Sequence, residues 1–146
     1  MSKWYGVEDV VCMSGLSERT VRNYLSMGLL VGEKVDGTWR FTAEQFEAFL
    51  RQEMVSQSVR AKANSIVYDF LLVEKRREGA ACLILDLPAA AGAAEAALRR
   101  RVVDGSNARG LRCSYRYQAA SGCARVILEG SPAQAASLVG ELSQTN

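Results

Sequence analysis

Residues 15–30, with the sequence GLSERTVRNYLSMGLL, decide how the first third of the chain folds. Apolar residues recur there at three- and four-residue spacing, at Val21, Tyr24 and Leu25. That spacing predicts a helix with one apolar face. Ser17 can cap its N-terminus, because a serine hydroxyl accepts a hydrogen bond from a free backbone N–H, and Gly28 can end it as a left-handed C-cap. The stretch therefore predicts a tight turn at residues 14–16 followed by a short amphipathic helix.

The polar face of this helix carries side-chain types that read DNA. It consists of Arg19, Thr20, Arg22 and Asn23. In a major groove, arginine pairs with guanine, asparagine pairs with adenine, and threonine contacts a phosphate or the methyl group of thymine. The same residues also suit an ordinary helix with a solvated face. The helix alone therefore favours neither interpretation over the other.

A small β-hairpin is expected after this helix. Residues 33–38 predict a polar loop, because they contain the hairpin turn signal Asp36-Gly37. The returning strand consists of Trp39, Arg40 and Phe41. Alternation along a strand sets Arg40 on the face opposite to its two aromatic neighbours. We expect this wing to place Lys34 and Arg40 on DNA phosphates.

Two further helices flank these elements. Residues 7–13 predict a first helix, because acidic residues stand in its first turn, where they suit a helix N-terminus. Thr42 and Gln45 have the spacing of a capping box, so another helix begins there. The order helix, turn, helix, wing, helix predicts a winged helix-turn-helix in residues 1–51.

These residues resemble the DNA-binding domain of the MerR superfamily, including its excisionase-like branch. The matching positions are residues 7–10, Ser17, residues 20–22, Tyr24, residues 28–30, Gly37, residues 39–41, Phe46 and Leu50. A combined motif of this kind is more specific than any of its parts. The resemblance implies a homodimer that binds double-stranded DNA at a two-fold symmetric operator, with contacts from the second helix and the wing.

Residue chemistry and resemblance together select a set of candidate DNA-binding residues. They are Ser17, Arg19, Thr20, Arg22, Asn23, Tyr24, Lys34, Trp39 and Arg40. Charge weighs against them, because residues 1–51 hold six basic and seven acidic side chains, whereas a DNA-binding domain normally has a basic excess. The hypothesis therefore requires the four cations of the helix and the wing to share one face.

Residues 52–78 form the second organising element, because they contain neither glycine nor proline. Apolar residues recur in them with the spacing of a coiled-coil seam, at Val59, Ala63, Ile66, Phe70 and Val73. At 1.5 Å per residue this helix would be roughly 40 Å long, too long to bury its seam on the small N-terminal domain. We expect it to hold a homodimer, as in MerR-like regulators. The alternative is a core helix in a single globule.

From residue 79 onward, short strands and helices are expected. The pattern predicts a buried strand at residues 80–87, a helix at 93–103 that ends at Asp104-Gly105, strands at 111–118 and 123–129, and a last helix that begins at Ser131-Pro132. This β-α-β-β-α order is a split βαβ-like unit without a fourth strand. The chain is therefore predicted to be α+β, with domains at residues 1–51, 52–78 and 79–146.

The role of residues 79–146 is open between an effector domain and a second dimerisation module. The candidates for a small-molecule effector site are Tyr115, Arg116 and Tyr117. Packing in the core or at a sheet edge is the alternative for the two tyrosines. The run Arg99-Arg100-Arg101 is expected to be a solvated helix end.

The sequence lacks the residue types and patterns that several classes of function require. The chain has no histidine, and its four cysteines form no CxxC pair, so no metal, cofactor or catalytic residue is expected. Cys113 and Cys123 fall on neighbouring strands, but the hairpin spacing would pair Cys113 near Ile127, which argues against a redox switch between them. No apolar run approaches the roughly 20 residues of a membrane span, and no signal core opens the chain. We expect a cytoplasmic protein without membrane contact.

The expected function is a sequence-specific, MerR-like transcriptional regulator that binds a two-fold symmetric operator as a homodimer, with the C-terminal domain as either an effector domain or a second dimerisation module. Two alternatives stay open. One is a phage- or plasmid-type architectural DNA-binding protein, such as an excisionase or a packaging subunit. The other is a winged-helix module that binds protein.

Overall fold

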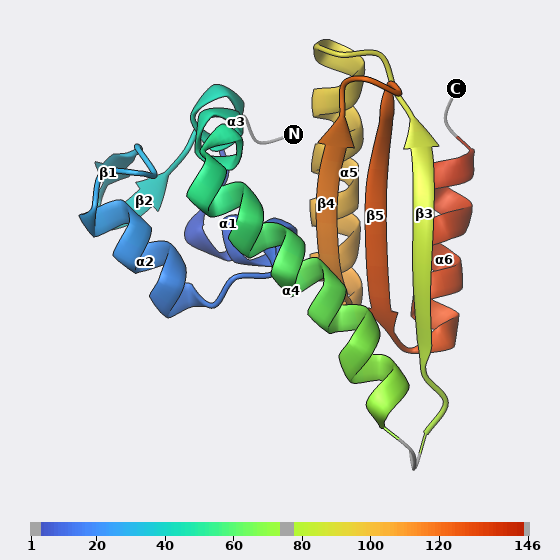
Figure 1. Cartoon of the computed structure of the whole chain (residues 1–146). Coiled ribbons are helices and arrows are strands. Elements are labelled where there is room, and N and C mark those ends of the chain that lie inside the picture. Colours follow the sequence, from blue (N-terminus) through green and yellow to red (C-terminus); the bar gives the residue numbers. More distant parts are fainter. Residues whose placement is uncertain (1–3, 74–77, 145–146) are drawn as a thin grey trace. The chain divides into compact units, whose positions relative to one another are not determined.

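The computed structural model describes residues 4–73 and 78–144 (Figure 1). Their helices and strands are α1 (Val7–Ser14), α2 (Glu18–Ser26), β1 (Glu33–Val35), β2 (Thr38–Arg40), α3 (Ala43–Arg51), α4 (Glu53–Leu72), β3 (Ala81–Pro88), α5 (Ala93–Arg109), β4 (Arg112–Gln118), β5 (Cys123–Gly130) and α6 (Pro132–Ser143). These residues thus form six helices and two small antiparallel sheets. The predicted α+β class is confirmed.

The chain divides into two compact units, Met1–Lys62 and Ala63–Asn146, called unit 1 and unit 2 below. Helix α4 contributes residues to both of them. The boundary between the units therefore falls inside the predicted long helix and not at either of its ends.

Unit 1 has an aromatic core. The rings of Tyr5 and Phe46 lie 5.7 Å apart, and those of Phe46 and Phe49 lie 6.4 Å apart. Tyr5 and Phe41 exchange two backbone hydrogen bonds of 2.8 Å each, which ties the N-terminal segment to the end of the hairpin. Buried rings supply a large apolar area for a small unit, so they contribute strongly to its stability.

The start of α3 is fixed by local hydrogen bonds. The Gln45 N–H donates to Thr42 Oγ1 at 3.0 Å, and the Thr42 N–H donates to Gln45 Oε1 at 2.9 Å. The two bonds form the predicted capping box and satisfy backbone donors that a helix start leaves free. The helices predicted at residues 7–13 and after Thr42 are confirmed as α1 and α3.

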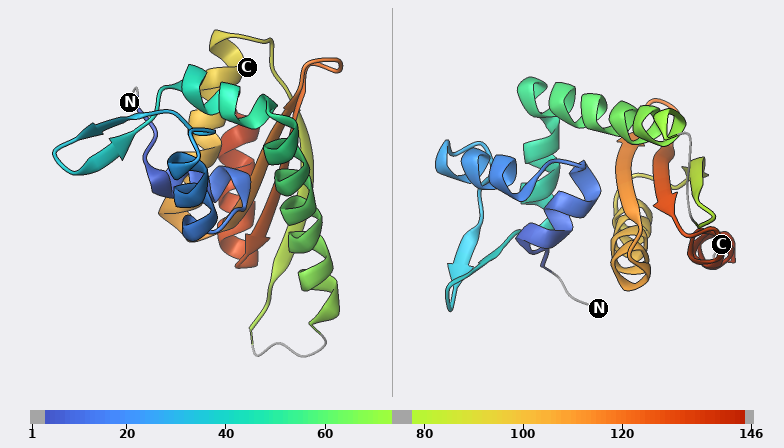
Figure 2. Two further views of the ribbon diagram at one scale, coloured as in Figure 1. Left: turned by 60° about the vertical axis from the view of Figure 1, so that its left-hand side comes forward. Right: turned by 90° about the horizontal axis from the view of Figure 1, so that it is seen from below.

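Unit 2 contains a three-stranded sheet in the order β3-β5-β4. Both neighbouring pairs are antiparallel, so β3 and β4 run parallel to each other with β5 between them. The predicted β-α-β-β-α order is confirmed, and its topology is a split βαβ unit. Helices α5 and α6 lie on one side of the sheet (Figure 2). On the other side, Asp69 of α4 pairs with Arg112 of β4 at 3.8 Å.

The strand register separates the residues of this sheet into two faces. Tyr115 faces α5, because its hydroxyl donates to Glu95. Its row across the sheet continues through Val126 to Leu85, so these residues share the helix-covered face. The adjacent row, formed by Ser114, Ile127 and Ile84, lies on the opposite face.

Strand β3 is an edge strand and not the buried strand that its apolar sequence predicts. None of its residues is buried, and the side chain of Ile84 is exposed. A continuous apolar run is typical of a strand covered on both faces, but β3 has a neighbour on one side only.

Helix α5 continues beyond its predicted end at Asp104-Gly105 and stops at Gly110, whose φ is +64°. Gly105 faces α6, and a Cβ atom at this position would lie 2.4 Å from Leu138 Cδ1. The glycine therefore allows two helices to approach closely, and this packing outweighs its poor helix propensity. The predicted solvated end is also wrong, because Arg99 and Arg100 are buried in the middle of α5.

Helix α4 is shorter than the helix predicted at residues 52–78. It ends at Leu72, so it is roughly 30 Å long and not 40 Å. Residues 74–77 lie outside the described residues. The prediction is therefore wrong at the C-terminal end, where Val73 already lies beyond the helix.

Candidate nucleic-acid interface

Helix α2 is held at both ends by local hydrogen bonds. At its start, Ser17 Oγ accepts the backbone N–H of the residue three positions later at 3.1 Å. At its end, the Leu29 N–H donates to the Tyr24 carbonyl at 3.0 Å, and the Gly28 N–H donates to the Leu25 carbonyl at 3.1 Å. With Gly28 at a φ of +77°, these bonds form a Schellman motif. The predicted cap and the predicted left-handed glycine are confirmed.

The apolar side of α2 faces the core of unit 1. Val21 is fully buried, and the ring of Tyr24 packs edge-on against Phe49 with 5.6 Å between the centroids. The Tyr24 hydroxyl lies 3.3 Å from Ser58 Oγ. The opposite side is exposed and carries Arg19, Arg22 and Asn23. Three of the predicted recognition residues therefore lie together in solvent.

Three other predicted contacts on this segment have structural roles. Tyr24 is buried, so the expectation that it meets DNA does not agree with its position. The Ser17 hydroxyl donates to Thr20 Oγ1 at 2.9 Å while it caps α2. Both hydroxyls are thus engaged in starting the helix, although Ser17 remains exposed.

The cations of α2 differ in their partners. Arg22 pairs with Glu18 one turn earlier at 3.1 Å, and its side chain is 54% exposed. For the side chains of Arg19 and Asn23, no hydrogen bond or ion pair is found within residues 4–73 and 78–144. An exposed pair at this spacing contributes only about 0.3–0.5 kcal/mol. Both arginines are therefore available to an anionic partner.

The hairpin follows α2 directly (Figure 1). Residues 33–38 were expected to form a loop, but β1 begins at Glu33 and the turn consists of Asp36-Gly37 alone. Both turn residues have a positive φ, of +50° and +78°. A two-residue turn with this geometry is of type I′, whose twist matches that of the two strands. The turn signal is confirmed, and the loop is shorter than expected.

The register of the hairpin separates its two cations. Lys34 pairs with Trp39, and its Nζ lies 5.8 Å from the centroid of the indole ring. Arg40 pairs with Glu33 in the next row, so it projects from the opposite face. Lys34 and Arg40 are both exposed, but they lie on opposite faces of the hairpin, so at most one of them can share a face with Arg19 and Arg22, and the requirement of one shared face is met only in part.

The predicted coiled-coil seam is largely covered within the chain. Val59 and Ile66 are buried, and Ala63 and Phe70 are half-buried. Val73 is exposed but lies beyond the end of α4. The apolar residues of α4 that remain most exposed are Met54, Tyr68, Leu71 and Leu72.

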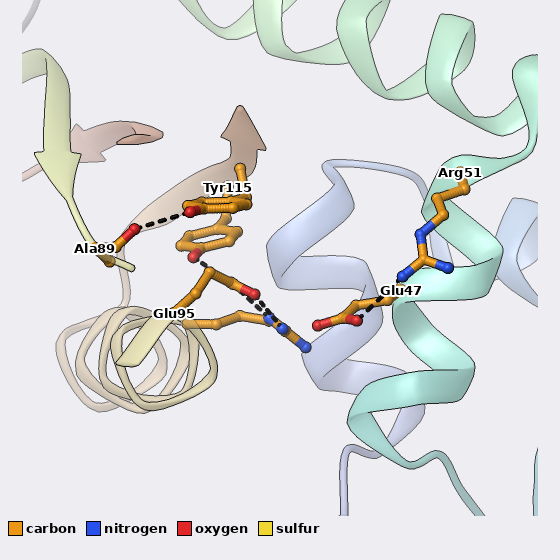
Figure 3. Close-up of polar contacts among 7 residues, drawn as sticks. Glu47, Arg51, Ala89, Glu95 and Tyr115 are labelled. Carbon is orange, nitrogen blue, oxygen red and sulfur yellow. Dashed lines mark hydrogen bonds and ion pairs between the residues drawn. The ribbon is translucent and has the colours of Figure 1, made fainter. Parts of the chain in front are cut away.

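The predicted effector face lies mostly inside unit 2. Tyr115 is buried, and its hydroxyl donates to Glu95 Oε2 at 2.5 Å (Figure 3). The Tyr117 hydroxyl donates to the Ala89 carbonyl at 2.8 Å, and Arg116 is half-buried. The sequence alternative of core and edge packing therefore describes the two tyrosines better than a ligand cleft.

A buried ion pair of unit 2 was missed from the sequence. Arg99 is 2% exposed, and its guanidinium donates to both carboxylate oxygens of Glu95, at 2.6 and 3.1 Å. The signal for this pair was the four-residue spacing of Glu95 and Arg99 on a predicted helix. Because two further arginines follow Arg99, the segment was predicted to be exposed to solvent, and the pair with Glu95 was not considered.

All four cysteines lie in the described part of the chain, and none of them forms a disulfide there. Cys113 pairs across the sheet with Leu128, and Cys123 pairs with Gln118, so the two thiols stand five rows apart. This register agrees with the argument against a redox pair. No group of three or more Cys, Asp or Glu side chains that could hold a metal occurs in the described part of the chain.

In comparisons with protein-family models, with curated proteins and with solved structures, no match to this chain was found. Of the helices in the described ranges, none combines the length and the apolar character that crossing a membrane would require.

Proposed function

We propose that this chain is a sequence-specific DNA-binding regulator of MerR-like type that acts in the cytoplasm as a homodimer on a two-fold symmetric operator. Residues 1–51 would be its winged helix-turn-helix, with α2 in the major groove and the β1–β2 hairpin as the wing. One observation carries the proposal. The exposed side of α2 presents Arg19, Arg22 and Asn23 together, while its buried side fixes the helix to the core through Val21 and Tyr24.

The chemistry of this face suits base recognition. Arginine donates two hydrogen bonds to guanine, and asparagine both donates and accepts with adenine. Glu18 does not block Arg22, because exchanging an exposed ion pair for a base or a phosphate loses little energy. Arg19 and Arg22 would therefore contribute both hydrogen bonds to bases and electrostatic attraction to the phosphates.

The wing supports the proposal in one of two orientations. A hairpin lying flat on the duplex offers only one of its faces, so either Lys34 or Arg40 meets phosphate. A hairpin entering a groove edge-on offers both faces to opposite walls. Arg40 is the better candidate, because Lys34 lies against Trp39 in the free protein.

The structure offers nothing in support of an effector site at Tyr115 and Tyr117, since both hydroxyls are hydrogen-bonded within unit 2. The proposal therefore leaves regulation by a ligand aside. Binding to DNA is assigned to unit 1 alone.

A second candidate function is a protein-binding module. Unit 1 has eight basic and eight acidic residues, so its net charge is zero. Met27 and Val31 are also exposed apolar side chains at the C-terminal end of α2. A surface with this mixture suits a protein partner as well as a duplex.

The two candidates are separated by salt dependence. Full-length protein is used to select bound fragments from a random duplex library, and the affinity of a selected fragment is measured by fluorescence anisotropy at several salt concentrations. We expect one consensus with two-fold symmetry and an affinity that falls steeply with salt, because bound phosphates release counterions. A steep salt dependence without any consensus would favour the architectural alternative. Absence of binding at low salt would favour the protein-binding module.

A matched pair of variants places the interface. Arg19→Ala should weaken binding to the selected fragment by roughly tenfold or more, in line with about 1–3 kcal/mol for a specific arginine contact. Arg51→Ala removes the same charge from an exposed side chain on α3, which pairs with Glu47 at 3.4 Å (Figure 3). It should leave affinity nearly unchanged. Equal losses of DNA affinity in both variants would show that net charge matters and would not support an interface on α2.

A further inference from the structure

The two edges of the unit 2 sheet differ in how they are protected. Strand β4 carries the basic residues Arg112 and Arg116, and Arg112 also pairs with Asp69 of α4 at 3.8 Å, so charged side chains and a helix contact protect this edge from pairing with another chain. Strand β3 has no basic residue, and its single charged residue is Asp86. Arg125 on the neighbouring strand neutralises Asp86 through two hydrogen bonds of 2.8 and 2.9 Å. The edge at β3 therefore lacks the charges that guard the edge at β4.

Strand β3 is also regular along its whole length. Its eight residues pair with eight consecutive residues of β5, so no bulge interrupts the strand, and its one proline is the last residue, Pro88. Bulges, internal prolines and short length are the other usual means of blocking an edge. A long, regular edge presents a row of backbone N–H and C=O groups to which another strand can bind.

The middle of this edge is apolar. Ile84 is 56% exposed, whereas its cross-strand neighbour Ile127 is only 7% exposed. Ile127 has a strand on each side, whereas Ile84 has a strand on one side only. A further strand beside β3 would cover part of the Ile84 side chain through cross-strand contacts.

We propose that β3 pairs in antiparallel fashion with β3 of a second copy of this chain, about a two-fold axis near Ile84, to give one continuous six-stranded sheet. An axis perpendicular to the sheet keeps α5 and α6 of both copies on the same face. It also brings even-numbered residues opposite even-numbered residues, so the two Ile84 side chains meet on the face opposite to α5 and α6. Cys82 then stands opposite Asp86, whose charge is already neutralised within its own chain.

A second copy fits this edge better than an unrelated strand because the segment is complementary to itself. In the sequence ACLILDLP, residues 83–85 are all large and aliphatic, and the antiparallel pairing places this segment on its own copy. The pairing also explains how a homodimer forms when the coiled-coil seam of α4 is already buried at Val59 and Ile66. The inference thus rests on the homodimer of the proposed function, but not on DNA binding.

The test is the oligomeric state of the full-length chain without DNA. By sedimentation equilibrium, the wild type should be a dimer at micromolar concentration. Ile84→Lys places a charge at the axis and should raise the dissociation constant of the dimer at least tenfold. Its circular dichroism should match the wild type, because Ile84 is exposed in a single copy. Ile84→Val keeps the β-branched shape and should remain dimeric.

A matched control examines the other exposed apolar surface. Leu71→Lys makes the same change at the end of α4, where Leu71 and Leu72 are exposed, and should leave the dimer intact. Amide hydrogen exchange should also slow at alternate residues of β3 as protein concentration rises. A monomeric wild type, or a dimer that Leu71→Lys dissociates and Ile84→Lys does not, would overturn the proposal. DNA binding measured in parallel on the same variants shows separately whether the proposed function holds.

Discussion

Helix α2 carries two arginines and helix α5 carries four, and the two helices place arginines in opposite surroundings. On α2, Arg22 is more than half exposed and pairs only with the exposed Glu18. On α5, Arg99 is buried against Glu95, and Arg100 is buried with its guanidinium 3.3 Å from Asp104. The run of three arginines in α5 therefore belongs to a helix packed in the protein interior, whereas the two separated arginines of α2 belong to the candidate interface.

The comparison teaches that arginine count is a poor guide to a binding surface. A buried arginine must have anionic or carbonyl partners inside the protein, so its charge is already used. The charge of an exposed arginine can still interact with an anionic binding partner. Substitutions on the two helices should accordingly affect different properties: stability for α5 and binding for α2.

The largest effect is expected at Arg99. Arg99→Met keeps much of the side-chain length but leaves the buried carboxylate of Glu95 without its cation, so the free energy of unfolding should fall by about 3–5 kcal/mol. Urea denaturation followed by circular dichroism measures this change. Arg101→Met is the control, because Arg101 is only half-buried and donates to the Glu141 carbonyl at 2.8 Å. Similar stability losses in both variants would remove the contrast between buried and exposed arginines.

The next effect concerns binding. Arg22→Ala should weaken affinity for a selected operator by about 1–3 kcal/mol and relax the base preference at one position. The same substitution should change the free energy of unfolding by less than about 0.5 kcal/mol, because the lost pair with Glu18 is exposed. Anisotropy titrations and urea denaturation of one preparation give both numbers. A large stability loss with unchanged affinity would place Arg22 in the same class as Arg99.

A smaller effect is expected at the wing. Arg40→Ala should weaken binding to all duplexes alike and reduce the slope of log affinity against log salt by about one unit. Lys34→Ala is the matched variant on the opposite face of the hairpin. Equal reductions in slope for both variants would indicate a wing inserted edge-on. A reduction for Arg40→Ala alone would indicate a wing lying flat, and no reduction for either would exclude the wing from the interface.

The smallest effect concerns an arginine that is exposed and yet paired. The hydrogen bonds from Arg125 lower the pKa of Asp86 below its ordinary value of 3.8, with a weaker opposing effect of desolvation. The pair therefore stabilises the fold at pH values above the ordinary pKa of 3.8, and this contribution is lost as the pH falls through the lowered pKa. Titration of the Asp86 carboxyl by NMR should show the pKa rising in Arg125→Ala and unchanged in Arg112→Ala. An unchanged pKa in Arg125→Ala would contradict the assigned cause.

Local chemistry made much of unit 1 predictable. The caps at Ser17 and Thr42 and the turn at Asp36-Gly37 depend on side chains within three or four positions of one another. Such interactions do not depend on the tertiary structure around them, so they can be predicted from the sequence. Strand β1 was wrongly predicted as a loop. The strand has three residues, of which two are charged, so it shows no apolar alternation in the sequence.

Unit 2 was harder because distant residues decide its details. The strand order, the burial of Arg99 and the continuation of α5 past Gly105 all depend on what lies across the sheet or on a neighbouring helix. An apolar run at β3 gives no sign of whether one strand or two will flank it. Helix periodicity likewise predicted a seam in α4 but not that the chain itself would cover it.

The candidate interface shows the same division. The exposed positions of Arg19, Arg22 and Asn23 follow from the helical period, which the sequence displays. Tyr24 was assigned to DNA through family resemblance, although its period already placed it with Val21 on the apolar face. Where period and resemblance disagreed, the period was correct.

The close approach of α5 and α6 at Gly105 has a consequence for how this sequence can change over time. Alanine at 105 alone would overlap Leu138, and a smaller residue at 138 alone would leave a cavity beside the glycine. A single change at either position thus disturbs the packing around Leu138, whereas the two changes together conserve the total volume. Divergent descendants of this chain should therefore vary the two positions as a pair, and a lineage that keeps glycine at 105 should keep a large aliphatic residue at 138.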